Sequence, residues 1–217
     1  MIEKIKNNKN TLKVFLIIGL TFGFQTSCYF FGQMSFGRAV LVDVWIDRIT
    51  PFIPEFVFVY LFWFIMVPAV PFVVYLYDKE KFYRYMVTMA MSAVMGFFIF
   101  TFYPITIPRY GGAIRGIANP VLSFVYWFDK PASCMPSFHV GTCIMFVLAT
   151  MFNKKIPKWF YYTVFILSVL VILSTLFIKQ HIVYDAAAAL ITVGISWFIA
   201  KKFKLDDKLR KLVKDVE

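Results

Sequence analysis

The sequence is poor in histidine, in cysteine and in charge. Its 217 residues include two histidines and three cysteines, and charged residues make up 16% of the chain. Cys28, Cys134 and Cys143 have neither the spacing of a zinc site nor that of a paired disulfide framework. The carboxylates form no cluster of the kind that Mg²⁺ or a two-metal site requires. We therefore expect no metal ion and no other cofactor.

Apolar residues take the place of the missing charge. Hydrophobic residues form 60% of the chain, against roughly 45–50% in soluble proteins. Five apolar runs approach or reach the length of about 17–25 residues that spans a bilayer, and a sixth reaches it only if it begins at Pro136. The sequence therefore predicts an all-α, six-span transmembrane helix bundle that forms a single integral membrane domain over residues 1–217. The expected spans are 14–31, 56–77, 85–103, 136–152, 159–178 and 182–200.

Basic residues are distributed unevenly between the two sides of this bundle. Six spans place both termini on one side, and that side carries most of the 23 lysines and arginines. The positive-inside rule makes it the cytoplasmic side. The net charge of +11 then reflects orientation and contact with anionic headgroups rather than nucleic acid. We expect a multi-pass protein of the cell membrane, or of an internal membrane, with a cytoplasmic basic tail at 201–217.

Three connecting segments have composition of their own. The tail 201–217 is expected to be either an amphipathic helix on the membrane surface or a solvated charged segment. The first outer connection, 32–55, is expected to contain an interfacial helix. The second, 104–136, is unusually long and contains prolines and a glycine pair, so it is a candidate functional loop.

Each of the two histidines lies in a short polar segment at the outer end of a span. His139 ends a Pro-Ser-x-His sequence at 136–139, in the first turn of the fourth span. His181 precedes Asp185 by four residues, so both side chains face the same side of the sixth helix. Ionisable groups at membrane depth are costly and indicate function. Two histidines with purely structural roles are the alternative.

The surroundings of these histidines favour an anion. The fourth and sixth spans run in the same direction, so both helix N-termini, which attract anions, face outward. Ser137 is suited to cap the fourth span. Arg109, Arg115 and Lys179 lie on the same side and can converge there. Because two histidines can act as nucleophile and acid, this constellation suits metal-free phosphoryl transfer.

The motifs resemble those of the type 2 phosphatidic acid phosphatase superfamily of membrane lipid phosphatases. The Pro-Ser-Gly-His motif of that family appears at 136–139 with Phe138 in place of glycine. Its Ser-Arg-x5-His-x3-Asp motif appears at 174–185 with Thr175 in place of arginine. A third motif, Lys-x6-Arg-Pro, is absent as such.

Smaller features are similar to one branch of the superfamily. Pro108-Arg109 looks like the counterpart of the missing Lys-x6-Arg-Pro motif. An Asp-x-Pro sequence at 129–131 and the Lys-Gln-His sequence at 179–181 are similar to inositol phosphorylceramide synthases and their bacterial relatives.

The resemblance implies a role for each motif residue. His181 would attack phosphorus and form a phosphohistidine, and Asp185 would orient and stabilise its ring. His139 would protonate the leaving oxygen and then activate the water or alcohol that resolves the intermediate. Lys179 is a candidate for the charge of the missing motif arginine, and Arg115 is a second. The residues expected to bind phosphate oxygens are Arg109, Ser137, Lys179 and Arg115.

The leading hypothesis is a phosphatase that acts on a lipid phosphate or diphosphate at the extracytoplasmic face. A lipid headgroup phosphotransferase, in which an alcohol replaces water, is the alternative enzyme. An inactive lipid-binding or transport scaffold is a third reading, suggested by the degraded first motif. The expected partners are the lipid substrate and the bilayer, and the sequence does not indicate an oligomeric state.

Overall fold

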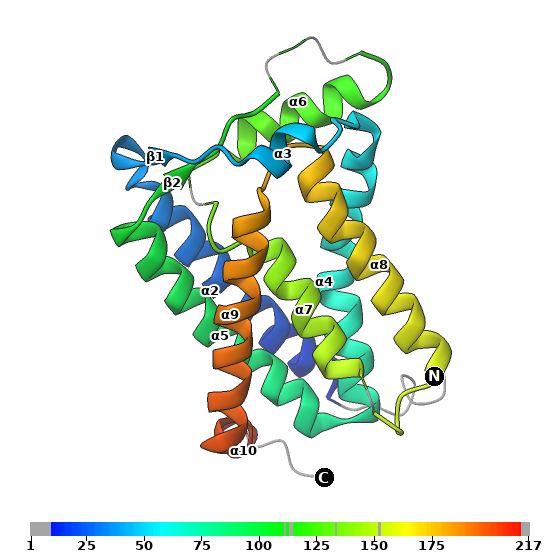
Figure 1. The fold of residues 1–217 in the computed structure, drawn as a ribbon. Coiled ribbons are helices and arrows are strands. Elements are labelled where there is room, and N and C mark those ends of the chain that lie inside the picture. Colours follow the sequence, from blue (N-terminus) through cyan, green and yellow to red (C-terminus); the bar gives the residue numbers. More distant parts are fainter. Residues whose placement is uncertain (1–9, 111, 113–114, 133, 152, 214–217) are drawn as a thin grey trace.

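The computed structural model of the protein describes residues 10–110, 112, 115–132, 134–151 and 153–213. Its main helices pass alternately up and down and pack into one bundle (Figure 1). These helices are α2 (Thr11–Gln33), α4 (Val57–Tyr77), α5 (Lys79–Phe102), α7 (Phe138–Thr150), α8 (Lys158–Phe177) and α9 (Val183–Lys202). This architecture confirms the prediction of a helical protein.

Among the described residues, five helices are long and apolar enough to cross a membrane, and they fit a multi-pass membrane protein. They are α2, α4 with the preceding η2 (Pro54–Phe56), α5, α8 and α9. The exception is α7, which has 13 residues and is therefore about 20 Å long, shorter than the hydrocarbon core of about 30 Å. It begins at Phe138, later than the expected Pro136, because Ser137 occupies the N-cap position.

Helix α7 lies inside the bundle, where it contacts α4, α5, α8 and α9. Gly96 allows α5 to lie close to the first turn of α7. A Cβ atom at Gly96 would lie 2.6 Å from the ring of Phe138, a separation at which atoms overlap. Phe138, which replaces the glycine of the family's Pro-Ser-Gly-His motif, therefore packs directly against Gly96 of α5.

Short elements cover the end of the bundle at which α7 and α9 begin (Figure 1). The segment after α2 contains η1 (Phe36–Arg38), β1 (Val40–Leu41) and α3 (Trp45–Ile49), and α3 occupies the connection that was expected to hold an interfacial helix. The long connection after α5 contains β2 (Ile105–Thr106) and α6 (Ala118–Phe128). Strands β1 and β2 pair in parallel, with Val40 opposite Ile105.

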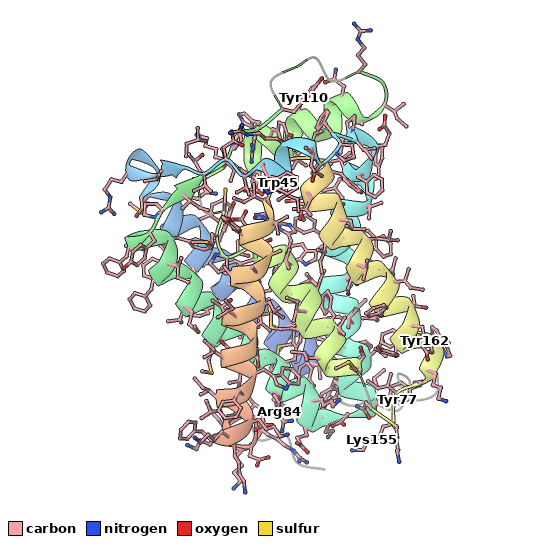
Figure 2. The ribbon with its side chains drawn as sticks, in the orientation of Figure 1. Trp45, Tyr77, Arg84, Tyr110, Lys155 and Tyr162 are labelled. Carbon is pink, nitrogen blue, oxygen red and sulfur yellow. The ribbon has the colours of Figure 1, made fainter. Side chains whose placement is uncertain are left out.

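The opposite end of the bundle carries α10 (Leu205–Leu212), so residues 205–212 of the tail are helical. Figure 2 shows Arg84 at this end, with Tyr77 and Lys155, away from Trp45 and Tyr110. Arg84 forms an ion pair with Asp206 at 2.6 Å, and their side chains are 12% and 3% exposed. Helix α10 therefore packs against α5 through a buried charge pair.

Candidate active site

His181 lies in the short connection between α8 and α9, and backbone hydrogen bonds fix its place. Lys179 adopts a left-handed conformation with φ of 54°, which ends α8. The N–H groups of Gln180 and His181 then donate to the carbonyl oxygen of Thr175 at 2.9 and 3.1 Å. The Thr that stands where the family motif has arginine thus contributes its backbone to the turn that positions His181.

Asp185 holds the imidazole of His181. Its Oδ2 lies 3.0 Å from His181 Nδ1 and also accepts the Ile182 N–H at 3.1 Å. Asp185 is fully buried, whereas His181 is 7% exposed. A carboxylate on Nδ1 fixes the tautomer and leaves Nε2 as the free nitrogen. This geometry suits Nε2 for nucleophilic attack.

His139 lies beside His181 in the first turn of α7. The two ring centroids are 5.9 Å apart. The N–H of Ser137 donates to the carbonyl oxygen of Asp185 at 3.2 Å, which ties the start of α7 to the start of α9. His139 Nε2 is buried and has no hydrogen-bond partner among the described residues. It is therefore available to exchange a proton with a bound molecule.

Aromatic rings hold His139 from the side of α4. Its ring centroid lies 4.5 Å from that of Tyr60 and 4.3 Å from that of Trp63. No carboxylate contacts His139 in the described part of the chain. The two histidines therefore differ, because His181 alone has a carboxylate that can stabilise a positive ring.

Three basic residues lie near His181 at the end of the bundle that carries α3 and α6. A polar cavity of about 310 Å³ lies there, and His181 is part of its wall. Its lining is mixed in charge and consists of Asp43, Asp47, Arg48, Ile107, Pro108, Arg109, Tyr110, Lys179, His181 and Ile182. We name it the polar cavity. A site with several cations beside a nucleophile suits a phosphate group.

Arg109 and Lys179 are both held by backbone carbonyl groups. Arg109 donates to the carbonyl oxygens of Tyr126, at 2.9 Å, and Asp129, and its guanidinium lies 4.5 Å from the Tyr126 ring centroid. Lys179 donates to the carbonyl oxygens of Asp47 and Thr50 at 2.7 and 2.6 Å. An ammonium has three donors, so Lys179 keeps one N–H for a ligand.

Burial shifts two ionisable groups of the polar cavity. It lowers the pKa of Lys179 below its ordinary value of 10.5, while the charge of Asp47 acts in the opposite direction. It also raises the pKa of Asp47, against the opposing effects of the Val183 N–H and of Lys179. Asp47 accepts the Val183 N–H at 3.2 Å and so caps α9 from outside that helix.

Two of the expected phosphate-binding residues do not line the polar cavity. Ser137 is 1% exposed, and its hydroxyl oxygen accepts the Val140 N–H at 3.3 Å as the cap of α7. Arg115 is exposed before α6, and the structure does not bring it to the histidines. Arg109 and Lys179 are thus the predicted cations that the fold brings to His181.

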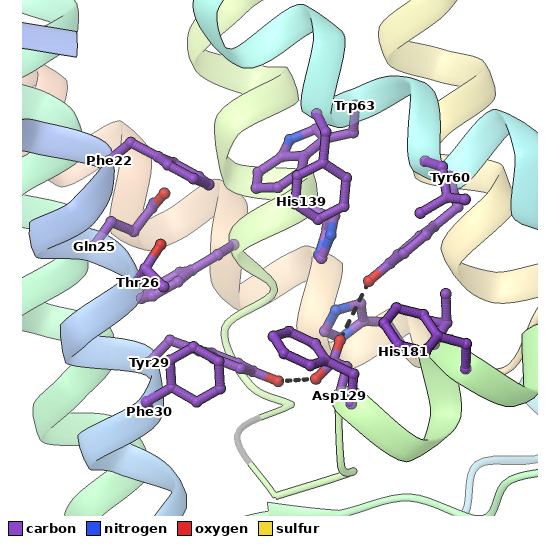
Figure 3. A pocket seen from close by; sticks show the side chains of 16 residues that line it. Phe22, Gln25, Thr26, Tyr29, Phe30, Tyr60, Trp63, Asp129, His139 and His181 are labelled. Carbon is purple, nitrogen blue, oxygen red and sulfur yellow. Dashed lines mark hydrogen bonds between the residues drawn. The ribbon is translucent and has the colours of Figure 1, made fainter. Parts of the chain in front are cut away.

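A second cavity of about 300 Å³ meets the histidines from the side of α2 and α4 (Figure 3). We name it the aromatic cavity. Its wall consists of Phe22, Gln25, Thr26, Tyr29, Phe30, Tyr60, Leu61, Trp63, Phe64, Phe124, Val125, Phe128, Asp129, Phe138, His139 and His181. His181 therefore belongs to the walls of both cavities.

The aromatic cavity contains a carboxylate that the motifs did not single out as a site residue. Tyr29 and Tyr60 donate their hydroxyl groups to Asp129, the latter at 3.2 Å, and Gln180 Nε2 donates at 3.0 Å. Figure 3 shows Asp129 between the two tyrosine hydroxyls. The Asp-x-Pro sequence was the only signal of this residue, and nothing in the sequence linked it to Tyr29 or Tyr60.

The described residues contain no group of three or more histidine, cysteine, aspartate or glutamate side chains that could hold a metal ion. The expectation of a metal-free site stays a prediction.

Comparison with known proteins identifies the family. A protein-family model described as the PAP2 superfamily matches residues 34–199, which include His139, His181 and Asp185. No similar curated protein and no similar solved structure was found. The narrower similarity to inositol phosphorylceramide synthases stays a prediction. Since the match extends over most of the chain, the protein belongs to the PAP2 superfamily, and this membership supports a phosphatase or phosphotransferase type of function on lipid phosphates.

Proposed function

We propose that the protein is a metal-independent lipid phosphate or diphosphate phosphatase that works through a phosphohistidine. The observation that carries this proposal is the contact of Asp185 with His181 Nδ1 at 3.0 Å, with His139 beside it. A buried His–Asp pair costs free energy in a membrane bundle, and orientation of a nucleophile accounts for that cost.

The reaction runs in two steps. His181 Nε2 attacks phosphorus, the bond from phosphorus to the lipid oxygen breaks, and protonated His139 gives its proton to that oxygen. His139, now neutral, then removes a proton from a water molecule, which attacks phosphorus while the P–N bond breaks. The products are a lipid alcohol, or a lipid monophosphate from a diphosphate, and inorganic phosphate. Asp185 stabilises the positive charge of the His181 ring during the first step.

The oxygens of the transferred phosphoryl group lie in the polar cavity in this proposal. Arg109 and Lys179 neutralise charge that develops there in the transition state.

The proposal includes a six-span topology in the cell membrane, with both termini cytoplasmic and the site at the outer face. Alternate helix directions support it, since α7 and α9 begin at the end that carries α3 and α6 (Figure 1). The short α7, together with the polar segment that precedes it, would be the fourth crossing in chain order and would bring the total to six.

A lipid headgroup phosphotransferase is the second candidate, and the aromatic cavity favours it. That cavity has His139 in its wall and an apolar lining suited to a lipid. In this variant an alcohol bound there, rather than water, resolves the phosphohistidine.

Phosphate release from purified protein in detergent with EDTA tests the proposal. A panel of lipid phosphates and diphosphates should yield inorganic phosphate without any alcohol acceptor. His181→Ala should lower kcat by about 10³-fold or more, because it removes the nucleophile. Arg109→Ala should also lower kcat/KM, whereas the matched variant Arg115→Ala should retain it.

Three results would contradict parts of the proposal. Loss of activity in EDTA would refute the metal-independent mechanism. Full activity of His181→Ala would refute the phosphohistidine. Phosphate transfer that requires an alcohol acceptor, with no release in its absence, would replace the phosphatase by the phosphotransferase.

A further inference from the structure

The two cavities that share His181 differ in charge. The polar cavity is lined by the cations Arg48, Arg109 and Lys179. The aromatic cavity has no lysine or arginine among its described lining residues, and Asp129 is its only acidic residue. An anionic phosphate is attracted by the first and repelled by the second. The uncharged part of a substrate therefore fits the aromatic cavity.

The surface of the aromatic cavity shows how such a molecule arrives. Four of its phenylalanines, from α2, α4 and the region of α6, are exposed on the outside of the bundle. They are Phe30 at 41%, Phe64 at 49%, Phe124 at 60% and Phe128 at 54%. An exposed apolar rim around a cavity marks a binding site. On a bundle with membrane-spanning helices, this rim faces lipid, so the occupant comes from the bilayer.

The hydrogen bonds that the described residues donate to Asp129 leave one acceptor position open. Gln180 and Tyr60 donate to Oδ2, whereas Tyr29 is the donor to Oδ1. A carboxylate can accept about four hydrogen bonds. No lysine or arginine forms an ion pair with this carboxylate among the described residues. A carboxylate in an apolar cavity binds a neutral hydroxyl group through a charge-assisted hydrogen bond.

A second unpaired atom lies in the same wall. Nε2 of His139 is buried and has no partner among the described residues. The oxygen from which phosphorus departs must reach this nitrogen, and after departure it becomes the hydroxyl of a lipid alcohol. Asp129 and His139 therefore both present polar atoms to the oxygen end of one molecule.

We propose that the aromatic cavity is a binding site for a lipid alcohol, whose hydroxyl group donates a hydrogen bond to Asp129. This inference rests on the proposed function, since the alcohol is what a lipid phosphate monoester leaves after dephosphorylation. Asp129 then holds the alcohol after the bond from phosphorus to its oxygen has broken, and its negative charge disfavours phosphate in the aromatic cavity. In the phosphotransferase variant, the same site holds the acceptor alcohol.

Direct binding tests the inference without turnover. Dodecanol that carries bromine at its far end should quench the fluorescence of Trp63, which lines the cavity, and Trp63→Phe identifies that part of the signal. The alcohol should bind about 10-fold or more tightly than its methyl ether, because the ether lacks the donor and a hydrogen bond to a charged group contributes about 1.5–3 kcal/mol. Equal affinity of alcohol and ether would overturn the inference.

Variants assign this preference to a residue. Asp129→Asn should bring the alcohol and the ether to about equal affinity, whereas the matched variant Asp43→Asn, in the polar cavity, should keep the preference. A preference that survives in folded Asp129→Asn would overturn the assignment. If Asp129→Asn does not fold, the comparison of alcohol and ether in the unchanged protein still decides.

Inorganic phosphate tests the separation of the two ligands. Phosphate in the polar cavity should leave the affinity for the alcohol nearly unchanged, because the two bind on different sides of His181. Strict competition between them would overturn the inference. Because the binding measurements involve no catalysis, failure of the binding inference would leave the expected release of phosphate from lipid phosphates unaffected. Conversely, an inactive protein that still binds the alcohol more tightly than the ether would refute the proposed function alone.

Discussion

Asp185 makes the two histidines chemically unequal. It contacts His181 Nδ1 at 3.0 Å, whereas His139 is packed between the rings of Tyr60 and Trp63. A positive ring that forms on attack at phosphorus is stabilised only where a carboxylate lies next to it. The proposed mechanism therefore assigns nucleophilic attack to His181 and proton transfer to His139.

At the same scale, the charge of Lys179 should shape the dependence of activity on pH. Because burial lowers the pKa of Lys179, this side chain loses its proton at a lower pH than an ordinary lysine. Loss of the cation removes charge from the polar cavity, so kcat/KM should fall on the alkaline side, below pH 10.5. Lys179→Arg should move this limb to higher pH, since arginine stays charged.

The matched control is Lys130→Arg, which changes an exposed lysine that lines neither cavity. It should leave the pH profile of kcat/KM unchanged. An alkaline limb at the same pH in Lys179→Arg and in the unchanged protein would show that another group causes it.

Sequence spacing was informative wherever partners are close in the chain. The interval of four residues predicted that His181 and Asp185 interact, and the structure places them in contact. The predicted shared helix face is wrong, because His181 precedes α9 and Asp185 in the first turn reaches back to it. The partners of Asp129 are different, because Tyr29 is 100 residues away and Tyr60 is 69 residues away. Only the packing of α2 and α4 against the end of α6 brings them together, and no local pattern encodes that.

At the scale of elements, the long apolar runs predicted α2, α4, α8 and α9 to within three residues at each end, whereas α5 begins at Lys79, six residues before the expected start. Bilayer thickness sets the length of these helices, so apolar runs of that length in the sequence indicate them directly. Helix α6 was expected only as part of a shaped loop, since its 11 residues lie in a connection with prolines and glycines. Its place over the aromatic cavity depends on contacts with α4 and η2.

Helix α10 should depend on its buried ion pair. Loss of one partner of a buried pair is destabilising because it leaves the other charge buried, although here Arg84 keeps a second ion pair with Glu80 at 2.6 Å, which compensates part of its charge. Asp206→Asn should therefore lower the Tm of the protein in detergent clearly more than Asp207→Asn, which changes an exposed neighbour on the same turn. Activity at low temperature should persist, because α10 lies at the end of the bundle away from the histidines. Equal Tm values for the two variants would show that the pair with Arg84 does not stabilise α10.

At the scale of the whole molecule, helix α10 and the two histidines lie at opposite ends of the bundle. The end with Arg84 and Lys155 also carries the basic helix α10, whereas the end with α3 and α6 covers the histidines (Figure 2). The excess of basic residues on short loops at one end predicts which end is cytoplasmic. A lipid phosphate of the outer leaflet would then reach the polar cavity with its headgroup and the aromatic cavity with its alkyl part.

Single cysteines should reveal this orientation in intact cells. In a protein with Cys28, Cys134 and Cys143 replaced by alanine, Arg115→Cys should react with a membrane-impermeant maleimide, because it is exposed at the end that covers the histidines. Lys155→Cys, whose native side chain is 68% exposed at the other end, should react only after the membrane is permeabilised. The reverse pattern would place the histidines in the cytoplasm. Equal reaction of both cysteines in intact cells would exclude a bundle that separates these ends across a membrane.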